Sequence, residues 1–334
     1  MEINSFLCLV NLVRETIQSY CLIEDNEPVV IGLSGGKDSI FLSIVMKHLG
    51  YKVYPVVVDV GFGRGRIDEV LRLCDDLEIE CRVLSIEDDS ILSAEDLSFI
   101  SKRYKALKEN GGVQSHNNTP CTLCYNVKIV ALNAYCRHVG ARKIALGHHY
   151  NDVVVSFLKT VFYYIDRWCE GNRVFDKNKF TSIVDQYAKV FLDANFIQTD
   201  KFREIESMVM KKVVSTEEPP KSIVIYENNK VDIIRPLFFV LEKDILCYYK
   251  LITNYIDIQG CIFRDYGCMT PREIVKKKIV DVMFSGGDIY DYSRFRELIL
   301  NNVSKDGYLI EQVRNKRDEI LGEEYKECFD KIKI

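Results

Sequence analysis

The sequence predicts an α/β fold, a doubly wound parallel sheet with helices on both faces. Short apolar runs of strand length alternate with longer segments whose apolar residues recur at helical spacing, and this alternation is typical of parallel sheets. A glycine-rich hexapeptide separates the first apolar run from the helix that follows it. A second polar segment that contains glycine follows the fourth run. Ligands bind beyond the carboxyl ends of the strands in such sheets, so both segments belong to one expected binding edge.

The elements are expected in a regular order along the chain. Residues 1–24 predict a leading amphipathic helix, because apolar side chains such as Val10 and Ile17 recur near helical spacing. Gly50 and Gly140 each follow an expected helix, and a residue without a side chain readily ends a helix. Strands are expected at 28–33, 53–59, 81–86 and 143–146, and helices at 40–49, 67–77, 92–107 and 121–138.

We expect four parts along the chain. They are an N-terminal helix at 1–24, a core at 25–160, a mostly helical insertion at 161–230, and a part at 231–334 that completes the core, carries a third cysteine ligand and adds C-terminal helices. Around the boundary between residues 230 and 231, the segments 222–226 and 231–234 predict a short hairpin. Residues 241–249 predict a helix. The chain has no internal repeat.

The composition narrows the class of function. Of 334 residues, 47% are apolar and 28% are charged, as in ordinary folded proteins. The net charge of −4 disfavours a long nucleic-acid groove, so contact with nucleic acid is expected to be local. The chain starts without a basic signal-peptide region and has no apolar run of membrane length, so we expect a cytoplasmic protein without a membrane partner. In that reducing compartment the twelve cysteines do not predict a disulfide framework.

The glycine-rich hexapeptide is a candidate phosphate-binding loop. Its residues are Ser34, Gly35, Gly36, Lys37, Asp38 and Ser39. Two adjacent glycines allow backbone N–H groups to approach phosphate oxygens closely, and the following helix offers further free N–H donors. The lysine adds a positive charge and the serines add hydroxyl donors, whereas the aspartate fits such a site when Mg²⁺ lies between it and the phosphates. The spacing differs from the Walker A pattern, and a plain glycine turn is the alternative.

Cys121 and Cys124 form a second motif, at the start of the helix expected at 121–138. A helix N-terminus lowers the pKa of a thiol and favours the thiolate, which is the form that binds metal. A structural zinc site needs two more ligands, and the chain has no second pair with this spacing. A redox pair is a further alternative, although such a pair is expected after the first strand of its domain. A third thiolate from a distant part of the chain, as in iron–sulfur sites, also agrees with the spacing.

Together the motifs resemble a known family. The segments that carry the resemblance are residues 34–39, residues 120–124 with Lys128, and residues 147–152 with the sequence Gly-His-His-Tyr-Asn-Asp. They resemble the PP-loop ATP pyrophosphatases, which cleave ATP between the α- and β-phosphates, and among these the iron–sulfur tRNA thiolation enzymes, the tRNA 2-thiocytidine and 2-thiouridine synthetases. The resemblance covers roughly residues 25–160 and 231–283 and implies an adenine nucleotide alpha-hydrolase-like core. The zinc-finger cysteines of the 2-thiouridine branch are absent, which favours the 2-thiocytidine type or an unassigned relative.

The resemblance implies where the nucleotide and its metal ion would bind. ATP would occupy residues 34–39, with Asp59 and Gly147 beside it. Mg²⁺ would lie between Asp38 and Asp152, and capping of the following helix is the alternative role of Asp152. The neighbouring histidines at 148 and 149 are expected to shape the segment rather than to act on the substrate.

The resemblance also implies a [4Fe-4S] cluster with three cysteine ligands, Cys121, Cys124 and Cys261. Two stretches, Ile234-Arg235-Pro236-Leu237 and Glu242-Lys243-Asp244-Ile245, resemble the family segment that leads to the third cluster cysteine. Cys261 is the next cysteine after this segment and its helix, and Cys268, seven residues later, competes with it. Lys128 would face the reacting centre one helical turn beyond Cys124 and stabilise negative charge on phosphate or base. A solvated helix residue is the alternative for Lys128.

The implied reaction is sulfur transfer to RNA. ATP would adenylate the C2 carbonyl oxygen of a tRNA pyrimidine, and sulfide would then attack the carbon and release AMP. The expected partners are tRNA and a sulfur donor, either sulfide or a persulfide carrier, and a homodimer is one option for the assembly. Two other classes stay open: a PP-loop ligase or amidating enzyme whose cysteine pair binds zinc, and a nucleotide-binding regulatory or defence protein that keeps the fold.

Overall fold

A computed structural model of the chain describes residues 3–61, 64–87, 90–109, 120–152, 231–253 and 271–280, with shorter pieces at 154–155, 158, 162, 215–216, 314–315 and 317–323. The chain divides into two compact units. The first comprises residues 1–149 and 212–267 with the last three residues, and the second comprises residues 150–211 and 268–331. The first unit contains the sheet and residues 34–39, so it positions the candidate site.

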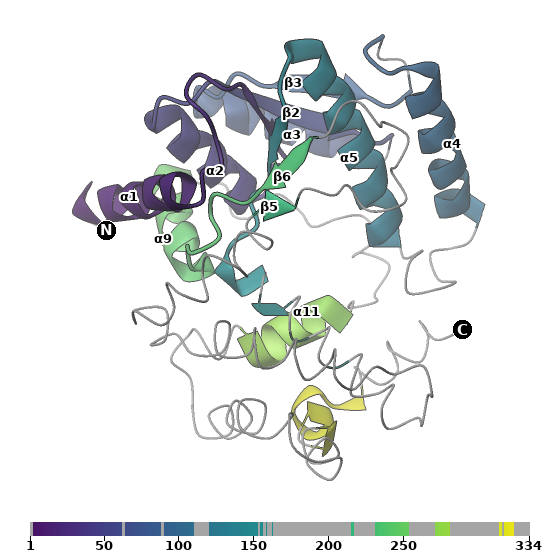
Figure 1. Cartoon of the computed structure of the whole chain (residues 1–334). Helices are drawn as coiled ribbons and strands as arrows, with labels where there is room; N and C mark the ends of the chain where they lie inside the picture. Colours follow the sequence, from purple (N-terminus) through teal and green to yellow (C-terminus); the bar gives the residue numbers. More distant parts are fainter. Residues whose placement is uncertain are drawn as a thin grey trace. The chain divides into compact units, whose positions relative to one another are not determined.

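Within the described residues the sheet of the first unit has six strands in the order β3-β2-β1-β4-β6-β5 (Figure 1). Each strand is parallel to its neighbours except β5, which runs antiparallel to β6. The predicted parallel α/β fold is therefore confirmed. The strands are β1 (Val29–Gly32), β2 (Val53–Asp59), β3 (Arg82–Ser85), β4 (Lys143–Ala145), β5 (Ser215–Thr216) and β6 (Asp232–Ile234).

The strand register brings the carboxyl ends of β1, β4 and β6 to one edge. Val29 is paired with Val53 of β2 on one side and with Lys143 of β4 on the other. Lys143 is also paired with Asp232 of β6, and their side chains form an ion pair of 2.6 Å. This register places the segments that follow β1, β4 and β6 at neighbouring positions, where ligands bind in such sheets.

Successive residues of the central strands alternate between the two faces of the sheet. Val56 packs in the core formed with α4 (Ala94–Glu109) and α5 (Pro120–Val139). The next residue, Val57, packs with Ile40 of α2 (Lys37–His48) and Leu73 of α3 (Arg64–Asp76). Figure 1 shows α4 and α5 side by side on their face. Helices on both faces confirm the doubly wound arrangement.

The N-terminal helix is present but shorter than expected. α1 spans Ile3–Ser19, and Val10, Val13 and Ile17 are almost fully buried along one side of it. The chain leaves the helix through Cys21, whose φ of 50° is left-handed, and the Leu22 N–H donates to the Ile17 carbonyl at 3.0 Å. This closing bond is typical of a helix C-terminus, so the expected continuation to residue 24 is wrong.

Asp96 fixes the start of α4 and ties this helix to α5. Its carboxylate accepts hydrogen bonds from the Ser93 N–H at 2.9 Å and the Ser93 hydroxyl at 2.8 Å, just before the helix begins. The same carboxylate forms an ion pair of 2.5 Å with Arg137 of α5, and the Asp96 side chain is fully buried. Helix α4 therefore begins at Ala94, two residues later than expected, because Ser93 and Asp96 cap it reciprocally.

Replacing Asp96 with alanine is expected to lower the free energy of unfolding by about 3 kcal/mol, because it removes the buried anion that Arg137 contacts. Chemical denaturation of the two proteins measures the difference. The matched control is Glu95→Ala in the same helical turn, where the side chain is exposed and the change should cost less than about 1 kcal/mol. Equal losses in the two variants would contradict the role given to Asp96.

The strand found beside β6 comes from an earlier segment than expected. Ser215 pairs with Ile234 and Thr216 with Ile233, both antiparallel. Residues 222–226, predicted as the first arm of a hairpin with β6, lie outside the described residues. Because β4 occupies the other side of Ile233 and Ile234, residues 215–216 take the position at this edge of the sheet.

The second unit is described in part, and its described residues are mainly helical. Residues 150–152 begin a helical stretch in which Tyr150, Val155 and Phe162 are buried. α11 (Pro271–Val275) continues into the π-helical turn η3 (Lys276–Val280), and the Lys278 ammonium donates to the Leu321 carbonyl at 2.8 Å. The predicted C-terminal helices are confirmed for these residues. None of the described helices combines the length and the apolar character that crossing a membrane requires.

Candidate functional site

The loop at residues 34–39 leaves β1 and enters α2 through two glycines. Gly35 has a φ of +79°, a left-handed conformation that side chains disfavour. Gly36 is the N-cap of α2, with φ −73° and ψ 153°, and no side chain caps this helix end. The N–H groups at this helix end therefore face the loop, which is the arrangement expected of a phosphate site.

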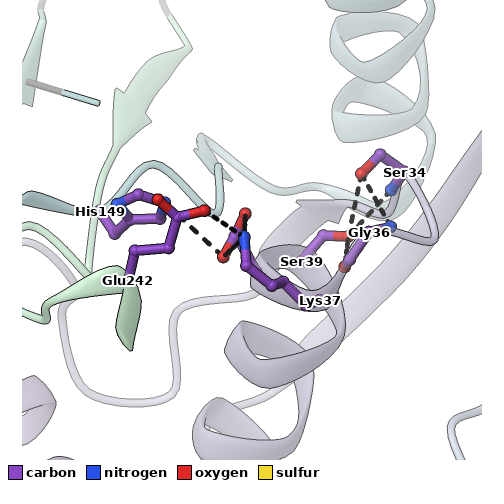
Figure 2. A network of polar contacts seen from close by, with 7 residues as sticks. Ser34, Gly36, Lys37, Ser39, His149 and Glu242 are labelled. Carbon is purple, nitrogen blue, oxygen red and sulfur yellow. Dashed lines mark hydrogen bonds and ion pairs between the residues drawn. The ribbon is translucent and has the colours of Figure 1, made fainter. Parts of the chain in front are cut away.

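Two serines hold the loop in this shape. The Ser34 N–H donates to Ser39 Oγ at 3.1 Å, and the Gly36 N–H donates to Ser34 Oγ at 3.3 Å. The Ser39 hydroxyl donates to the Gly36 carbonyl at 3.0 Å (Figure 2). Ser39 is buried, whereas Ser34 is exposed. Ser39 therefore stabilises the loop, and Ser34 is the serine that a ligand can reach.

Lys37, the first residue of α2, directs its ammonium at two carboxylates. Its Nζ lies 2.7 Å from Glu242 Oε1 and 3.0 Å from Asp38 Oδ2 (Figure 2). Burial by itself lowers the pKa of this ammonium, but the charges of Asp38 and Glu242 outweigh burial and raise the pKa above its usual value. Lys37 is therefore firmly charged at the loop.

Gly147 brings the segment after β4 into contact with the loop. A methyl group at Gly147 would lie 2.9 Å from the Asp38 carbonyl carbon and 2.9 Å from the Ser39 nitrogen. Both atoms belong to the backbone, so only a glycine permits this approach. The sequence predicts that residues 34–39 and the segment after the fourth strand share one binding edge. The contact of Gly147 with the loop confirms this prediction for Gly147.

His149 joins the same network. Its side chain is 1% exposed, and its Nε2 lies 3.7 Å from Asp38 Oδ1 and 3.9 Å from Glu242 Oε2. These separations exceed hydrogen-bond length, so the contact is electrostatic and depends on protonation. The sequence predicts only that this histidine shapes its segment, and it places Glu242 in the family segment before the third cysteine without a role at the loop. Glu242 opens α9 (Glu242–Ile252), and an acidic residue in a first turn is too common a pattern to single out.

The close approach of α5 to the end of β1 depends on Gly32. A methyl group there would lie 3.0 Å from Leu132 Cδ1 and 3.1 Å from Leu146 Cδ2. Cys136, one turn later in α5, contacts the Lys143 carbonyl at the start of β4. α5 therefore runs antiparallel to the strands, and its first turns extend beyond their carboxyl ends.

This packing shows how far the predicted site residues of α5 lie from the sheet. Lys128 precedes Leu132 by one helical turn, and Cys124 precedes Lys128 by another, so each lies about 6 Å further beyond the edge of the sheet. Both side chains are half-buried. Cys121 also belongs to α5, but its side chain lies outside the described residues. The roles of these residues stay predictions.

Arg235 is a further cation at this edge that the sequence reasoning did not select. It directly follows β6, and the Leu146 N–H donates to the preceding Ile234 carbonyl at 3.0 Å. Burial lowers the pKa of the Arg235 guanidinium, and Tyr125 of α5 acts in the opposite direction. Burial likewise raises the pKa of Tyr125, against the influence of Arg235. The sequence places Arg235 in the family segment Ile234-Arg235-Pro236-Leu237, directly after a strand, but assigns it no role.

The remaining predicted residues are not brought into this network by the described structure. Asp59 ends β2, and its carboxylate accepts a hydrogen bond from the Gly61 N–H at 2.8 Å, which shapes the turn. Asp152 belongs to the second unit and is the third residue of a helical stretch that starts at Tyr150, so the N-cap alternative is wrong. Cys261 and Cys268 lie outside the described residues. The nucleotide role of Asp59 and the metal role of Asp152 stay predictions.

The chain is similar in sequence to curated tRNA-cytidine(32) 2-sulfurtransferases. Over 165 residues it is 30% identical to the protein of Pseudomonas entomophila (strain L48), and the alignment covers 46% of this chain and 52% of that protein. The protein of Pseudomonas fluorescens (strain Pf0-1) is 29% identical with the same coverage. The chain thus spans about half the length of the curated relatives it matches. The resemblance predicted from the motifs is confirmed.

Among solved structures, the chain matches the U34-tRNA thiolase NcsA from Methanococcus maripaludis with its [4Fe-4S] cluster. The TM-score is 0.50 at 17% identity, over 92% of this chain and 81% of that chain. At this identity the likeness concerns the fold alone, and it agrees with the parallel α/β fold predicted from the sequence. No protein-family model matches the chain.

Proposed function

We propose that this protein is an ATP-dependent sulfurtransferase that adenylates a nucleobase carbonyl, the C2 carbonyl of a tRNA pyrimidine, and replaces its oxygen by sulfur. The main support for the proposal is that two motifs lie at the same edge of the sheet. A phosphate loop closed by Ser39 and approached by Gly147 lies at the carboxyl edge of the sheet. The helix that opens with the cysteine pair packs on β1 through Gly32 and extends beyond the same edge. The similarity to tRNA-cytidine(32) 2-sulfurtransferases supports the choice of substrate.

The loop has the groups that ATP cleavage between the α- and β-phosphates requires. Gly35 and Gly36 carry no side chain that would keep phosphate oxygens away from the backbone at the start of α2, and Lys37 adds a fixed positive charge. Together they would hold the phosphates and the pyrophosphate that leaves. The base carbonyl oxygen attacks the α-phosphorus, and pyrophosphate departs. Sulfide then attacks the base carbon, and AMP departs with the former carbonyl oxygen.

Mg²⁺ fits this loop in one specific way. Among the described residues no group of three or more His, Cys, Asp or Glu side chains is arranged to hold a metal. A magnesium ion in a nucleotide site, however, takes only one or two carboxylates and completes its shell with phosphate oxygens and water. Asp38, which contacts Lys37 at 3.0 Å, would supply such a carboxylate once the phosphates are bound.

The cysteine pair fits an iron–sulfur cluster by its chemistry. Cys121 and Cys124 stand in the first turns of α5, a spacing that puts both positions on one face of the helix. A helix N-terminus favours the thiolate form that iron binds. With Cys261 as the proposed third ligand, a bound [4Fe-4S] cluster would supply an iron that lacks a protein ligand and takes up sulfide. Lys128, one turn further along α5, would stabilise negative charge that develops on the phosphate or the base.

The test is a reconstitution of the full chain without oxygen. The protein is purified anaerobically and incubated with total tRNA, ATP, Mg²⁺ and sulfide, and the nucleosides of the tRNA are analysed by mass spectrometry. We expect a brown protein and a 2-thiopyrimidine nucleoside that appears only when ATP is present. A persulfide carrier in place of sulfide identifies the donor.

A colourless protein with stoichiometric zinc that consumes ATP without thiolation would contradict the proposal and favour a zinc-containing ligase. ATP binding without pyrophosphate release would favour a regulatory protein.

A further inference from the structure

Glu242 and Lys37 stand 205 positions apart in the chain, yet their charged atoms are in direct contact. Glu242 Oε1 lies 2.7 Å from Lys37 Nζ, and the two side chains are only 16% and 20% exposed. Tyr249, two turns further along α9, packs with Ile40 of α2 in one core cluster. The packing of α9 against α2 therefore brings the first turn of one helix to the first turn of the other.

We propose that Glu242 is a positioning residue of the phosphate loop, whose carboxylate holds the Lys37 ammonium in place before the nucleotide binds. The inference rests on the proposed function, because it assigns Lys37 to the phosphates of ATP.

The reason lies in the length of the lysine side chain. Four rotatable bonds separate the Lys37 ammonium from α2, and fixing them costs conformational entropy. Asp38, the next residue in the chain, contacts the ammonium from its own helix at 3.0 Å. Glu242 contacts it from a separate element (Figure 2), so the two carboxylates hold the ammonium from α2 and from α9. A group that is already in position when the substrate arrives contributes more to the transition state than a mobile one.

His149 supports this arrangement. Its Nε2 lies 3.7 Å from Asp38 Oδ1 and 3.9 Å from Glu242 Oε2, so it lies beside both carboxylates that hold Lys37. The imidazole is buried at the segment after β4. Glu242 therefore links three parts of the site: the loop after β1, the segment after β4 and the start of α9.

The negative charge of Glu242 also has a predictable effect on the binding of ATP. Its negative charge stands next to the place that the polyphosphate would occupy, so its removal cannot weaken ATP binding through charge. If Glu242 positions Lys37, removal of its carboxylate should therefore affect turnover and the affinity for ATP differently. A purely structural tie between α9 and α2 predicts instead that stability, affinity and turnover fall together.

The test uses Glu242→Gln, which preserves the size of the side chain and removes its charge. We expect kcat for ATP cleavage with tRNA to fall about tenfold or more, as for a group displaced from its productive position. The Kd for ATP, measured by calorimetry with Mg²⁺ present, should stay the same or become tighter. Glu242→Asp keeps the charge on a shorter side chain and should recover part of kcat. Lys243→Gln, an exposed neighbour on α9, is the matched control and should change neither quantity.

A second readout does not depend on sulfur transfer. Lys37 is acylated with a small amine-reactive reagent, and its modification rate is followed by mass spectrometry of the peptide that contains it. In Glu242→Gln this rate should rise several-fold, because the ammonium is no longer held from α9. An unchanged rate would overturn the inference even if the wild-type enzyme thiolates tRNA. Protection of wild-type Lys37 by ATP tests the proposed phosphate loop separately, so the two proposals can fail independently.

Discussion

Replacing Cys124 with alanine is expected to abolish sulfur transfer and to leave ATP binding intact. The thiol of Cys124 is half-buried in the first turns of α5, two turns before the contact of Leu132 with the end of β1. A three-cysteine cluster site that loses one ligand cannot retain the cluster. We therefore expect thiolation of tRNA to fall by about a hundredfold or more, a loss at least as large as that seen when groups that only support metal ligands are removed.

ATP binding should survive because the loop is built from other elements. Ser34, Gly36 and Ser39 close the loop with their own hydrogen bonds, and Lys37 is held by Glu242 of α9. None of these bonds involves α5. The Kd for ATP in Cys124→Ala should therefore match that of the wild type.

Two measurements check this result. The visible absorbance of the anaerobic protein should disappear in Cys124→Ala, and the thionucleoside should disappear with it. The control is Cys8→Ala, since Cys8 is an exposed thiol on α1, and this variant should keep both the colour and the activity. Full thiolation by Cys124→Ala would show that the cysteine pair does not hold the sulfur-carrying group. Loss of ATP binding in the same variant would show that α5 supports the loop directly.

Replacing Gly147 with alanine should have the second large effect. The added methyl group would lie 2.9 Å from the Asp38 carbonyl carbon and 2.9 Å from the Ser39 nitrogen, closer than such contacts normally occur. Neither neighbour can rotate away, because both are backbone atoms at the start of α2. The loop or the segment after β4 must shift instead. We expect the free energy of unfolding to fall by about 1–3 kcal/mol, as in other overpacked sites, and ATP affinity to fall sharply as the loop is displaced.

The control separates lost stability from damage to the site. Gly140 has a φ of +69°, and apart from the adjoining residues no atom lies within 4 Å of a methyl group placed there. Gly140→Ala therefore introduces backbone strain of about 1 kcal/mol at the far end of α5 without touching the loop. Denaturation and calorimetry with ATP should show a loss of stability in both variants but a loss of affinity only in Gly147→Ala. Unchanged affinity in Gly147→Ala would mean that the loop does not bind ATP in the form described.

Much of the fold could be predicted because its signals are local. Runs such as Val29-Val30-Ile31 have the length and branching of buried strands, and Gly50 ends α2 with a φ of +80°. The hexapeptide at 34–39 carries its own turn and hydrogen bonds within six positions. The end of α1 is predicted wrongly, because the apolar spacing continues to Tyr20 and Leu22 although the chain has already left the helix. A periodic pattern shows which side chains are buried, but it does not show where the backbone hydrogen bonds stop.

The sequence alone predicts the parallel α/β fold, the turn at residues 34–39 and the position of the cysteine pair at the start of a helix. Each depends on residues within a few positions of one another, so backbone geometry and side-chain type suffice. The side chains that gather around this loop depend instead on tertiary packing. Glu242 reaches Lys37 because α9 packs on α2, and His149 reaches Asp38 because Gly147 allows β4 to end against the loop. These contacts join positions more than a hundred residues apart, and the packing of apolar faces that creates them leaves no local mark in the sequence.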